Sequence, residues 1–418
     1  MRLSLLIRRT SSVVTCNGPI SAGAASALDA QPGACVGVAG AKVAFIGGEG
    51  ELPAGAVDTA TQVLDAAGGF VGPGFVDPHT HVVFAGERSL EFEMRCAGAN
   101  YLDIAQKGGG IASTVRATRA ASEEDLFTEA LPRLRRLLSF GVTTAEVKSG
   151  YGLSVAEELK LLRVISKLGQ AQPISLHATL LALHAAPPDA PRDAYLKACV
   201  EELLPQVAAQ RLARFVDAFV EKGAFTASET RPFIDAAKRL GLGVKLHVDQ
   251  LNAGGGAEFA ADVRAVSADH LENISDAGAR ALAQAGVVAT LMPTSTLFLR
   301  QKFYAPGRKL WDLGVPMALA SNVNPGSAMS ENHALALGLA CLENGLTPQE
   351  AYWASTRGGA LALALTDAGR LAVQGPADLV IFGCPHPRML PYHLGISQVR
   401  SVVKGGQLVW SAPAVGNS

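Results

Sequence analysis

The chain has 418 residues, which is enough for one large domain with an accessory piece or for two domains. Its 36 Lys and Arg nearly balance its 37 Asp and Glu, and a net charge of −1 offers no field for holding nucleic acid or an anionic membrane. No window has the roughly 18 apolar residues that a membrane helix needs, and the six cysteines form no CxxC pair, so we expect a cytoplasmic protein with reduced thiols.

The first 70 residues contain short β-type runs separated by turn-forming residues, namely "LLIRR", "SSVVTC", "CVGVAG" and "KVAFIGG". The other end of the chain has a similar character, with the runs "GRLAVQGPADLVIFG" and "VRSVVKGGQLVW". From this likeness we expect residues 1–70 and 368–418 to meet in one small β domain.

Residues 71–367 alternate strand-like with helical runs. The clearest helix is "SEEDLFTEALPRLRRLLSF", in which Ser122 and Asp125 resemble a capping box and Leu126, Ala130 and Leu134 follow at helical spacing. The strand-like runs are "GFVDPHTH", "VTTAEVK", "ISLHATLLALH", "RFVDAFVE", "GVKLHV", "AVSADH", "GVVATLM" and "VPMALAS". Eight such runs predict an α/β fold with a (β/α)8 TIM-type barrel over 71–367.

Polar residues stand where these apolar runs end, and this regularity supports the barrel more than the number of runs does. They are His79, His81, Lys148, His184, Glu221, His247, His270 and Asn322. Active sites of TIM barrels form at the C-terminal ends of the strands, so we expect these groups to gather at one rim.

Two histidines are one residue apart in "DPHTH". If residues 75–81 are extended, His79 and His81 project from the same face while Thr80 turns away. With His247 they offer nitrogen ligands to one zinc or iron ion and leave a position for water. A bound cation lowers the pKa of such a water towards neutrality, which predicts a hydrolase.

The remaining histidines have other interpretations. His270, in "SADHLE", is expected to act as a general base or an oxyanion partner beside the metal, with a structural hydrogen bond as the alternative. His177 is interpreted as structural, and His333, His386 and His393 show no spacing that assembles a site.

Several segments together resemble one enzyme family. They are "PGFVDPHTHVVFAGER", "EFEMRCAGANYLDIAQKGGGI", "EVKSGYGL", "GVKLHVDQ", "AVSADHLE" and "NPGS", and they are similar to imidazolonepropionase, an amidohydrolase-superfamily enzyme of histidine degradation. The resemblance runs from about residue 60 to residue 400. It implies a barrel beside a composite β-sandwich, one zinc or iron ion, a small substrate with a carboxylate, a possible homodimer, and hydrolysis of 4-imidazolone-5-propanoate to N-formimino-L-glutamate.

The resemblance also implies roles for individual residues. The metal ligands would be His79, His81, His247 and the residue at position 322. The substrate contacts would be Arg88, Tyr151, His184, Gln250, Asn324, Gly326 and Ser327.

Some of these implied roles agree with the chemistry of the side chains. The planar fork of Arg88 suits a propionate tail, with an ion pair to Glu87 or Glu91 as the alternative. His184 would polarise the ring carbonyl or stabilise an oxyanion, and Gln250 would both donate to and accept from the ring amide.

Position 322 departs from the family, which has an aspartate there. Asn322 lacks the charge of a ligating carboxylate and cannot act as a base at neutral pH. We therefore predict low turnover unless His270 takes over the proton transfer. The asparagine is equally compatible with an engineered substitution, a drift towards a binding protein, and adaptation to a related ring.

Two further functions stay open at this point. A deaminase or deiminase of the same superfamily would attack an exocyclic C–N carbon and release ammonia, whereas ring opening releases none. A non-catalytic binding homologue or an inactivated variant would keep the pocket without the proton acceptor, and Asn322 is the residue that favours it.

Overall fold

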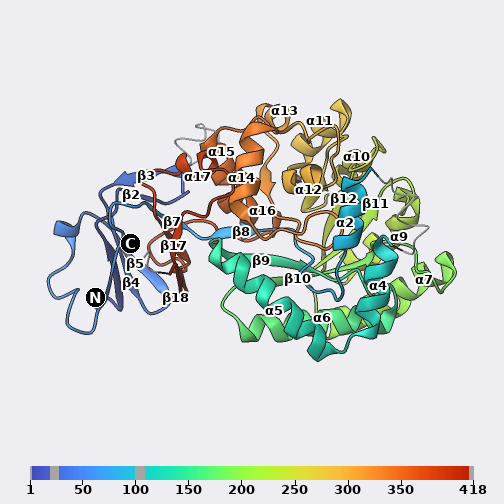
Figure 1. Ribbon diagram of the computed structural model, residues 1–418, viewed down its shortest axis with the longest axis horizontal. Coiled ribbons are helices and arrows are strands. Elements are labelled where there is room, and N and C mark those ends of the chain that lie inside the picture. The colour runs from blue at the N-terminus through green and yellow to red at the C-terminus, as the bar shows by residue number, and fades with distance from the viewer. Residues whose placement is uncertain (1, 19–27, 99–108, 414–418) are drawn as a thin grey trace.

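The computed structural model describes residues 2–18, 28–98 and 109–413. Strands from the two ends of the chain lie together at one end of the molecule, and the barrel with its helices fills the other (Figure 1). Residues 99–108 of the family-like segment 91–111 lie outside the described residues.

Eight parallel strands form one sheet in chain order, which confirms the predicted (β/α)8 barrel. They are β8 (Phe75–Asp77), β9 (Val142–Lys148), β10 (Ser175–Leu183), β11 (Phe215–Val220), β12 (Gly243–Val248), β13 (Ser267–His270), β14 (Val288–Leu291) and β15 (Met317–Leu319). Each of the eight predicted runs contains one of them.

The first strand is shorter than expected, because β8 ends at Asp77 instead of continuing to His81. Pro78 has no backbone N–H, so the ladder to β9 breaks there and resumes with one hydrogen bond from Lys148 N to Thr80 O at 2.9 Å. On its other side this segment meets the residues after β15: Asn322 N donates to the carbonyl of His79 at 3.1 Å. The two ends of the barrel sheet are therefore joined next to the histidine pair.

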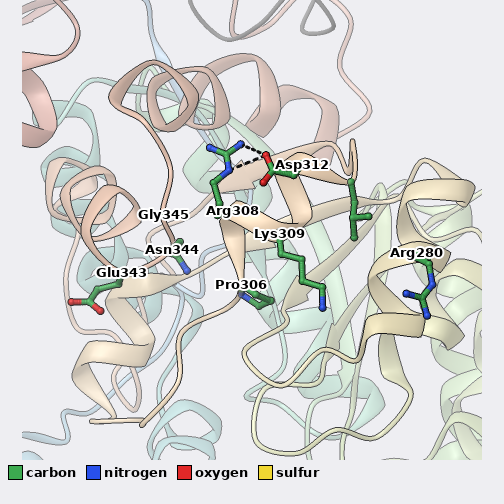
Figure 2. Close-up of a pocket in the computed structure, with 9 residues that line it drawn as sticks. Arg280, Pro306, Arg308, Lys309, Asp312, Glu343, Asn344 and Gly345 are labelled. Carbon is green, nitrogen blue, oxygen red and sulfur yellow. Dashed lines mark hydrogen bonds and ion pairs between the residues drawn. The ribbon is translucent and has the colours of Figure 1, made fainter.

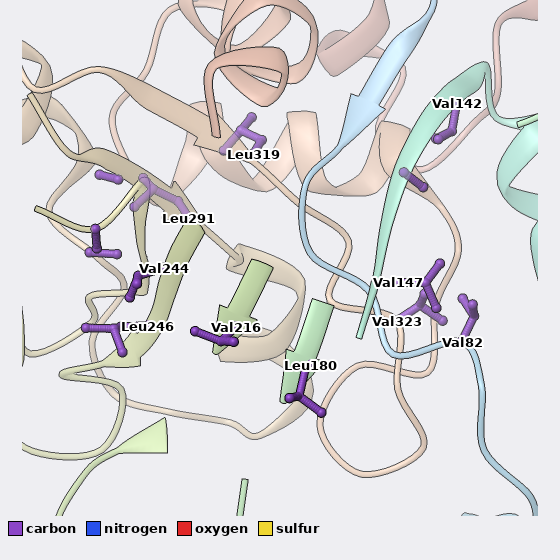
Figure 3. Close-up of a cluster of buried hydrophobic side chains, with 14 of the residues drawn as sticks. Val82, Val142, Val147, Leu180, Val216, Val244, Leu246, Leu291, Leu319 and Val323 are labelled. Carbon is purple, nitrogen blue, oxygen red and sulfur yellow. The ribbon is translucent and has the colours of Figure 1, made fainter. Parts of the chain in front are cut away.

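The barrel wall is packed with apolar side chains that point into the layers on either side of it. Figure 3 shows Val142, Leu180, Val216, Leu291 and Leu319, from five different strands, in one buried cluster. Each of these is fully buried, and such burial stabilises a fold by roughly 1.5–3 kcal/mol for each Val or Leu. These apolar contacts hold the strands together and position the residues at their C-terminal ends.

Helices follow the strands around the outside of the barrel. The predicted capping box is confirmed, since Ser122 and Asp125 bond reciprocally at the start of α5, which continues through Pro132. The helices are α2 (Ser89–Cys96), α4 (Ile111–Ala120), α5 (Glu123–Ser139), α6 (Val155–Ala171), α7 (Arg192–Ala198), α8 (Leu204–Ala209), α9 (Ala227–Arg239), α10 (Gly256–Asp262), α11 (Asp276–Ala285), α12 (Pro293–Phe298), α13 (Gly307–Asp312), α14 (His333–Leu342), α15 (Pro348–Trp353), α16 (Gly359–Ala362) and α17 (Met389–Tyr392), with a 3-10 turn at η2 (Glu49–Glu51) and π-helical turns at η3 (Cys199–Leu203) and η4 (Ala354–Gly358). No helix of the described residues is long and apolar enough to cross a membrane.

The chain ends form two further sheets, with strand orders β5-β4-β1-β6 and β18-β17-β16-β7-β2-β3. Their strands are β1 (Leu5–Arg8), β2 (Ser12–Val14), β3 (Ala30–Pro32), β4 (Cys35–Ala39), β5 (Lys42–Gly47), β6 (Gln62–Asp65), β7 (Val71–Pro73), β16 (Leu379–Phe382), β17 (Val399–Lys404) and β18 (Gln407–Ser411). The second sheet contains strands from both ends, as expected. The run at 369–383 is a strand only over β16, because Gln374 and Gly375 turn to bond Val43 instead.

Candidate active site

Three histidines converge at the C-terminal ends of the barrel strands. His79 and His81 follow β8 and His247 lies on β12. All three are buried, and one nitrogen atom from each ring lies within 4.8 Å of the other two. His79 Nε2 is 3.1 Å from His81 Nε2, and the His79 and His247 ring centroids are 4.4 Å apart. Despite the shorter β8, the expected convergence of these imidazoles is present.

The three imidazoles are held in the neutral form. Burial, with Lys148 as the next contribution, places the pKa of His79 well below its ordinary range; burial and then His184 do the same for His81. Burial also lowers the pKa of His247, against the opposing charge of Asp217. A neutral imidazole keeps a free lone pair, so this set of nitrogens fits a zinc or iron ion.

Two aromatic side chains complete this side of the rim. His184 follows β10 and stacks on His81, with ring centroids 5.4 Å apart and an interplanar angle of 19°. Tyr151 lies 5.4 Å from His184 and 6.0 Å from His81 by the same measure. Burial raises the pKa of the Tyr151 phenol, which therefore remains protonated as a hydrogen-bond donor.

The tautomer of His184 changes its expected role. Its Nδ1 is 3.0 Å from the carbonyl oxygen of Gly150, which can only accept, so Nδ1 carries the hydrogen. Burial lowers the pKa of His184 to about 3, so Nε2 is a hydrogen-bond acceptor at neutral pH. Polarising a carbonyl or stabilising an oxyanion would need a donor there, so this geometry argues against the role expected from the sequence.

The loop that carries Tyr151 is built around one buried carboxylate. Glu158 accepts hydrogen bonds from the backbone N–H groups of Gly150, Gly152 and Leu153 at 2.7 to 2.9 Å. Leu153 adopts a left-handed conformation with φ of 52°, which costs energy for a side chain with a Cβ. The three bonds offset that cost and fix the loop beside His184.

The segment after β15 folds into a compact turn organised by Asn324. Its side-chain oxygen accepts from Gly326 N and Ser327 N, both at 2.8 Å, and its amide nitrogen donates to Ser327 Oγ at 2.8 Å and to Asn322 O at 2.7 Å. The Asn324 side chain thus stabilises the turn through these four hydrogen bonds. Asn322 itself is buried, with a left-handed φ of 54°.

Arg88 reaches this turn from the start of α2. It makes two hydrogen bonds to Glu91 Oε2, from Nε at 2.9 Å and from Nη2 at 2.6 Å, so the ion pair considered as an alternative is present. Its Nη1 remains directed at Gly326. A cavity of about 290 Å³ opens here, with Arg88, Phe92 and Met329 among its lining residues.

Gln250 follows β12 and His270 ends the neighbouring strand β13. Glu221 accepts from the backbone of Gln250 at 2.9 Å, which fixes the loop after β12. The His270 ring centroid is 5.3 Å from that of His247 and 5.7 Å from that of His79. Its Nδ1 is 3.6 Å from Glu272 Oε1.

Comparison with known proteins places this geometry in a family. Residues 70–409 match the amidohydrolase family. The chain is 58% identical to the imidazolonepropionase of Myxococcus xanthus (strain DK1622) over 97% of each chain, and 51% identical to that of Anaeromyxobacter sp. (strain K) over 98% of this chain and 97% of the relative. The chain belongs to the imidazolonepropionase family.

Solved structures support the fold of this family member. A triazine hydrolase variant aligns with a TM-score of 0.76 at 17% identity, covering 99% of this chain and 96% of its own. The 5-methylcytosine deaminase of Klebsiella pneumoniae aligns with a TM-score of 0.72, also at 17% identity, over 99% and 97% of the two chains.

Sequence reasoning missed the charged side chains behind the histidines of this imidazolonepropionase relative. Glu146, Asp217, Lys245 and Asp269 are fully buried inside the barrel, on β9, β11, β12 and β13. The signal was available, because a charged residue in the middle of an apolar strand run must find a buried partner. Which partner it finds could not be read from the run itself.

A second, wider cavity lies away from the histidines. It has a volume of about 650 Å³ and is lined by residues of α11, α13 and the segment after α14, including Arg280, Arg308 and Lys309 (Figure 2). Two of its cations are already paired, Arg308 with Asp312 at 2.8 Å and Lys309 with Asp276. The buried histidine cluster, with its chemically reactive groups, is the better candidate for the active site.

Proposed function

We propose that this chain hydrolyses the ring amide of 4-imidazolone-5-propanoate and yields N-formimino-L-glutamate, a step of histidine degradation. The observation that carries the proposal is the convergence of three neutral histidines beside the contact between Arg88 and Gly326, in a chain 58% identical to an imidazolonepropionase. The three histidines suit a metal-dependent hydrolase. The position of Arg88 suits a substrate with a carboxylate tail.

His79, His81 and His247 would hold one zinc or iron ion. Such an ion supplies an activated water at neutral pH and polarises the carbonyl that the water attacks. Asn322 adds no charge to this set of ligands, so the proposed site is formed by neutral side chains.

The proton of the attacking water needs an acceptor, and His270 is the group that we assign to this role. Its Nδ1 is 3.6 Å from Glu272 Oε1, which is too long for a hydrogen bond, and Nε2 would take the proton. The ring C–N bond then breaks, and the same nitrogen of His270 returns the proton to the departing ring nitrogen. The oxygen of water ends in the new carboxylate.

Four residues near the end of the barrel strands would orient the substrate. Arg88 would hold the propionate through Nη1, which Glu91 does not use. Tyr151 would donate from its phenol, His184 would accept from a ring N–H through Nε2, and Gln250 would pair with the ring amide.

Purified protein loaded with zinc or with ferrous iron tests the proposal. We expect loss of 4-imidazolone-5-propanoate and formation of N-formimino-L-glutamate without ammonia release, at a rate that depends on metal. Stoichiometric ammonia would instead assign a deaminase. Tight binding of the ring without product, in protein of full metal content, would assign a binding homologue.

Three expectations from the sequence remain predictions. They are zinc or iron as the ion, the domain boundaries that separate 71–367 from 1–70 and 368–418, and a homodimer.

A further inference from the structure

Two buried carboxylates lie directly behind two of the three clustered histidines. Asp269 Oδ2 is 2.6 Å from Nδ1 of His79, and Asp217 Oδ2 is 3.0 Å from Nδ1 of His247. The Asp269 contact is a hydrogen bond, whereas the Asp217 oxygen is close but not aligned for one. The Nδ1 of His81 has no such partner among the described residues.

The two aspartates belong to a larger buried group, the lysine–carboxylate cluster of Glu146, Lys148, Asp217, Lys245 and Asp269. Lys148 Nζ is 2.7 Å from Asp217, 2.8 Å from Glu146 and 3.7 Å from Asp269, and Lys245 Nζ is 3.1 Å from Glu146. The five side chains are fully buried. Lys148 therefore ties the two aspartates to each other across the barrel.

The cluster is not a second metal site. His79, Glu146 and Asp269 do bring three possible ligand atoms together. However, the ammonium groups of Lys148 and Lys245 lie within 3.1 Å of the same Glu146 oxygen, where a cation would have to bind. The lysines already supply the positive charge.

A carboxylate behind an imidazole determines which ring nitrogen is free. An ionised carboxylate only accepts, so the hydrogen of the His79 ring is on Nδ1 and the lone pair on Nε2 is left for a ligand. For His247, the Asp217 oxygen at 3.0 Å favours the same tautomer through its negative charge. Such a partner also fixes the ring orientation and increases the basicity of the ligand nitrogen. The Asp269 carboxylate is itself held, because Ser267 Oγ donates to its other oxygen at 2.6 Å.

We infer that Asp217 and Asp269 are positioning residues that set the tautomer and orientation of His247 and His79 for metal binding, and that Lys148 holds the two carboxylates in register. The inference rests on the proposed metal site. The two carboxylates are especially important in this chain because Asn322 contributes no negative charge to the proposed metal site. Negative charge in contact with the ligand histidines then comes from behind them, through Asp217 and Asp269.

The test compares Asp269→Asn and Asp217→Asn with Glu146→Gln as the matched control. Each substitution removes one negative charge from the same cluster. Among the described residues, Glu146 bonds to Thr179, Lys148 and Lys245 and forms no hydrogen bond or ion pair with His79 or His247. The readouts are the zinc dissociation constant by chelator competition and the visible absorption spectrum of the cobalt-loaded protein. Thermal unfolding of the metal-free proteins reports the shared cost to folding.

We expect zinc to bind about 10- to 100-fold more weakly to the two aspartate variants, with an altered cobalt spectrum. Asp269→Asn should have the larger effect, because its contact is the aligned one. Glu146→Gln should keep the cobalt spectrum and stay within about threefold of the unmodified affinity. Ser267→Ala, which keeps every charge, should also alter the spectrum, and it serves if an aspartate variant does not fold.

Equal loss of affinity in all three charge variants would overturn the inference, since the cluster would then act only through its charge or through the stability of the fold. Unchanged affinity and spectra would also overturn it. If the unmodified protein binds neither zinc nor cobalt, the proposed metal-dependent function fails first, and this inference fails with it.

Discussion

The guanidinium of Arg88 lies directly against Gly326: a Cβ atom added at position 326 would come within 2.2 Å of Arg88 Nη1. No side chain fits in that space while the arginine keeps its position. The contact joins the start of α2 to the turn after β15, two segments more than 200 residues apart in the sequence.

Gly326→Ala tests whether this contact is the carboxylate site. The methyl group displaces the flexible end of Arg88 without entering the core, so the fold should be retained. Losing one well-placed charged hydrogen bond costs roughly 1.5–3 kcal/mol, so KM should rise on the order of tenfold or more, with a smaller change in kcat. Inhibition by a ring compound without a carboxylate should not change; a parallel loss would mean that the substitution disturbs the whole site.

Asn322→Asp tests the proton-transfer argument. In the proposed site, a carboxylate at this position would supply both an anionic ligand and a general base, and a positioned base contributes about 10²- to 10⁴-fold. We expect kcat to rise by at least tenfold at equal metal occupancy, measured with metal content determined on both samples. Comparable rapid turnover by both proteins would contradict this prediction, because it would mean that His270 transfers the proton as efficiently alone as with a carboxylate at position 322.

Glu158→Gln tests the support of the loop that carries Tyr151. The amide replaces one accepting oxygen with a donor that faces a backbone N–H, so at least one of the three bonds to Gly150, Gly152 and Leu153 is lost. We expect a higher KM and a lower kcat with unchanged zinc affinity. Glu157→Gln, one residue earlier and paired with Lys160 on the surface side, is the control. Loss of metal binding in Glu158→Gln would contradict a role limited to the loop.

The burial of His333 leads us to expect that the stability of the folded protein depends on pH. His333 packs on Phe75, with ring centroids 5.0 Å apart, and both ring nitrogens are buried without a hydrogen-bond partner among the described residues. Burial lowers the pKa of His333 from 6.5 to about 4. Between these values the unfolded chain binds a proton that the folded protein does not, so stability falls as pH decreases from 6.5 to 4, by ~3 kcal/mol from this group.

His333→Gln should therefore flatten the dependence of the unfolding free energy on pH in this window. Urea unfolding at pH 7.5 and pH 5 measures it, with His393→Gln, a less buried histidine, as the control. An unchanged difference between the two pH values in the His333 variant would exclude it as a source of acid sensitivity.

The sequence by itself determined the local features of this protein. The capping box at Ser122 and the strand over 243–248 were predicted at the observed residues, because both depend on contacts within a few positions of the chain. The gathering of histidines at one rim was also predicted, since parallel barrel strands place their C-terminal ends together whatever their spacing in the chain.

Only the tertiary structure decided which charges meet. Asp269 contacts His79 across 190 positions, Lys148 bonds Asp217 across 69, and no periodic pattern encodes either pair. The tautomer of His184 depends on a carbonyl 34 residues away, and the early end of β8 depends on Pro78 and on bonds to the residues after β15. Burial makes these pairings specific, because a charge inside the barrel is stable only beside its partner.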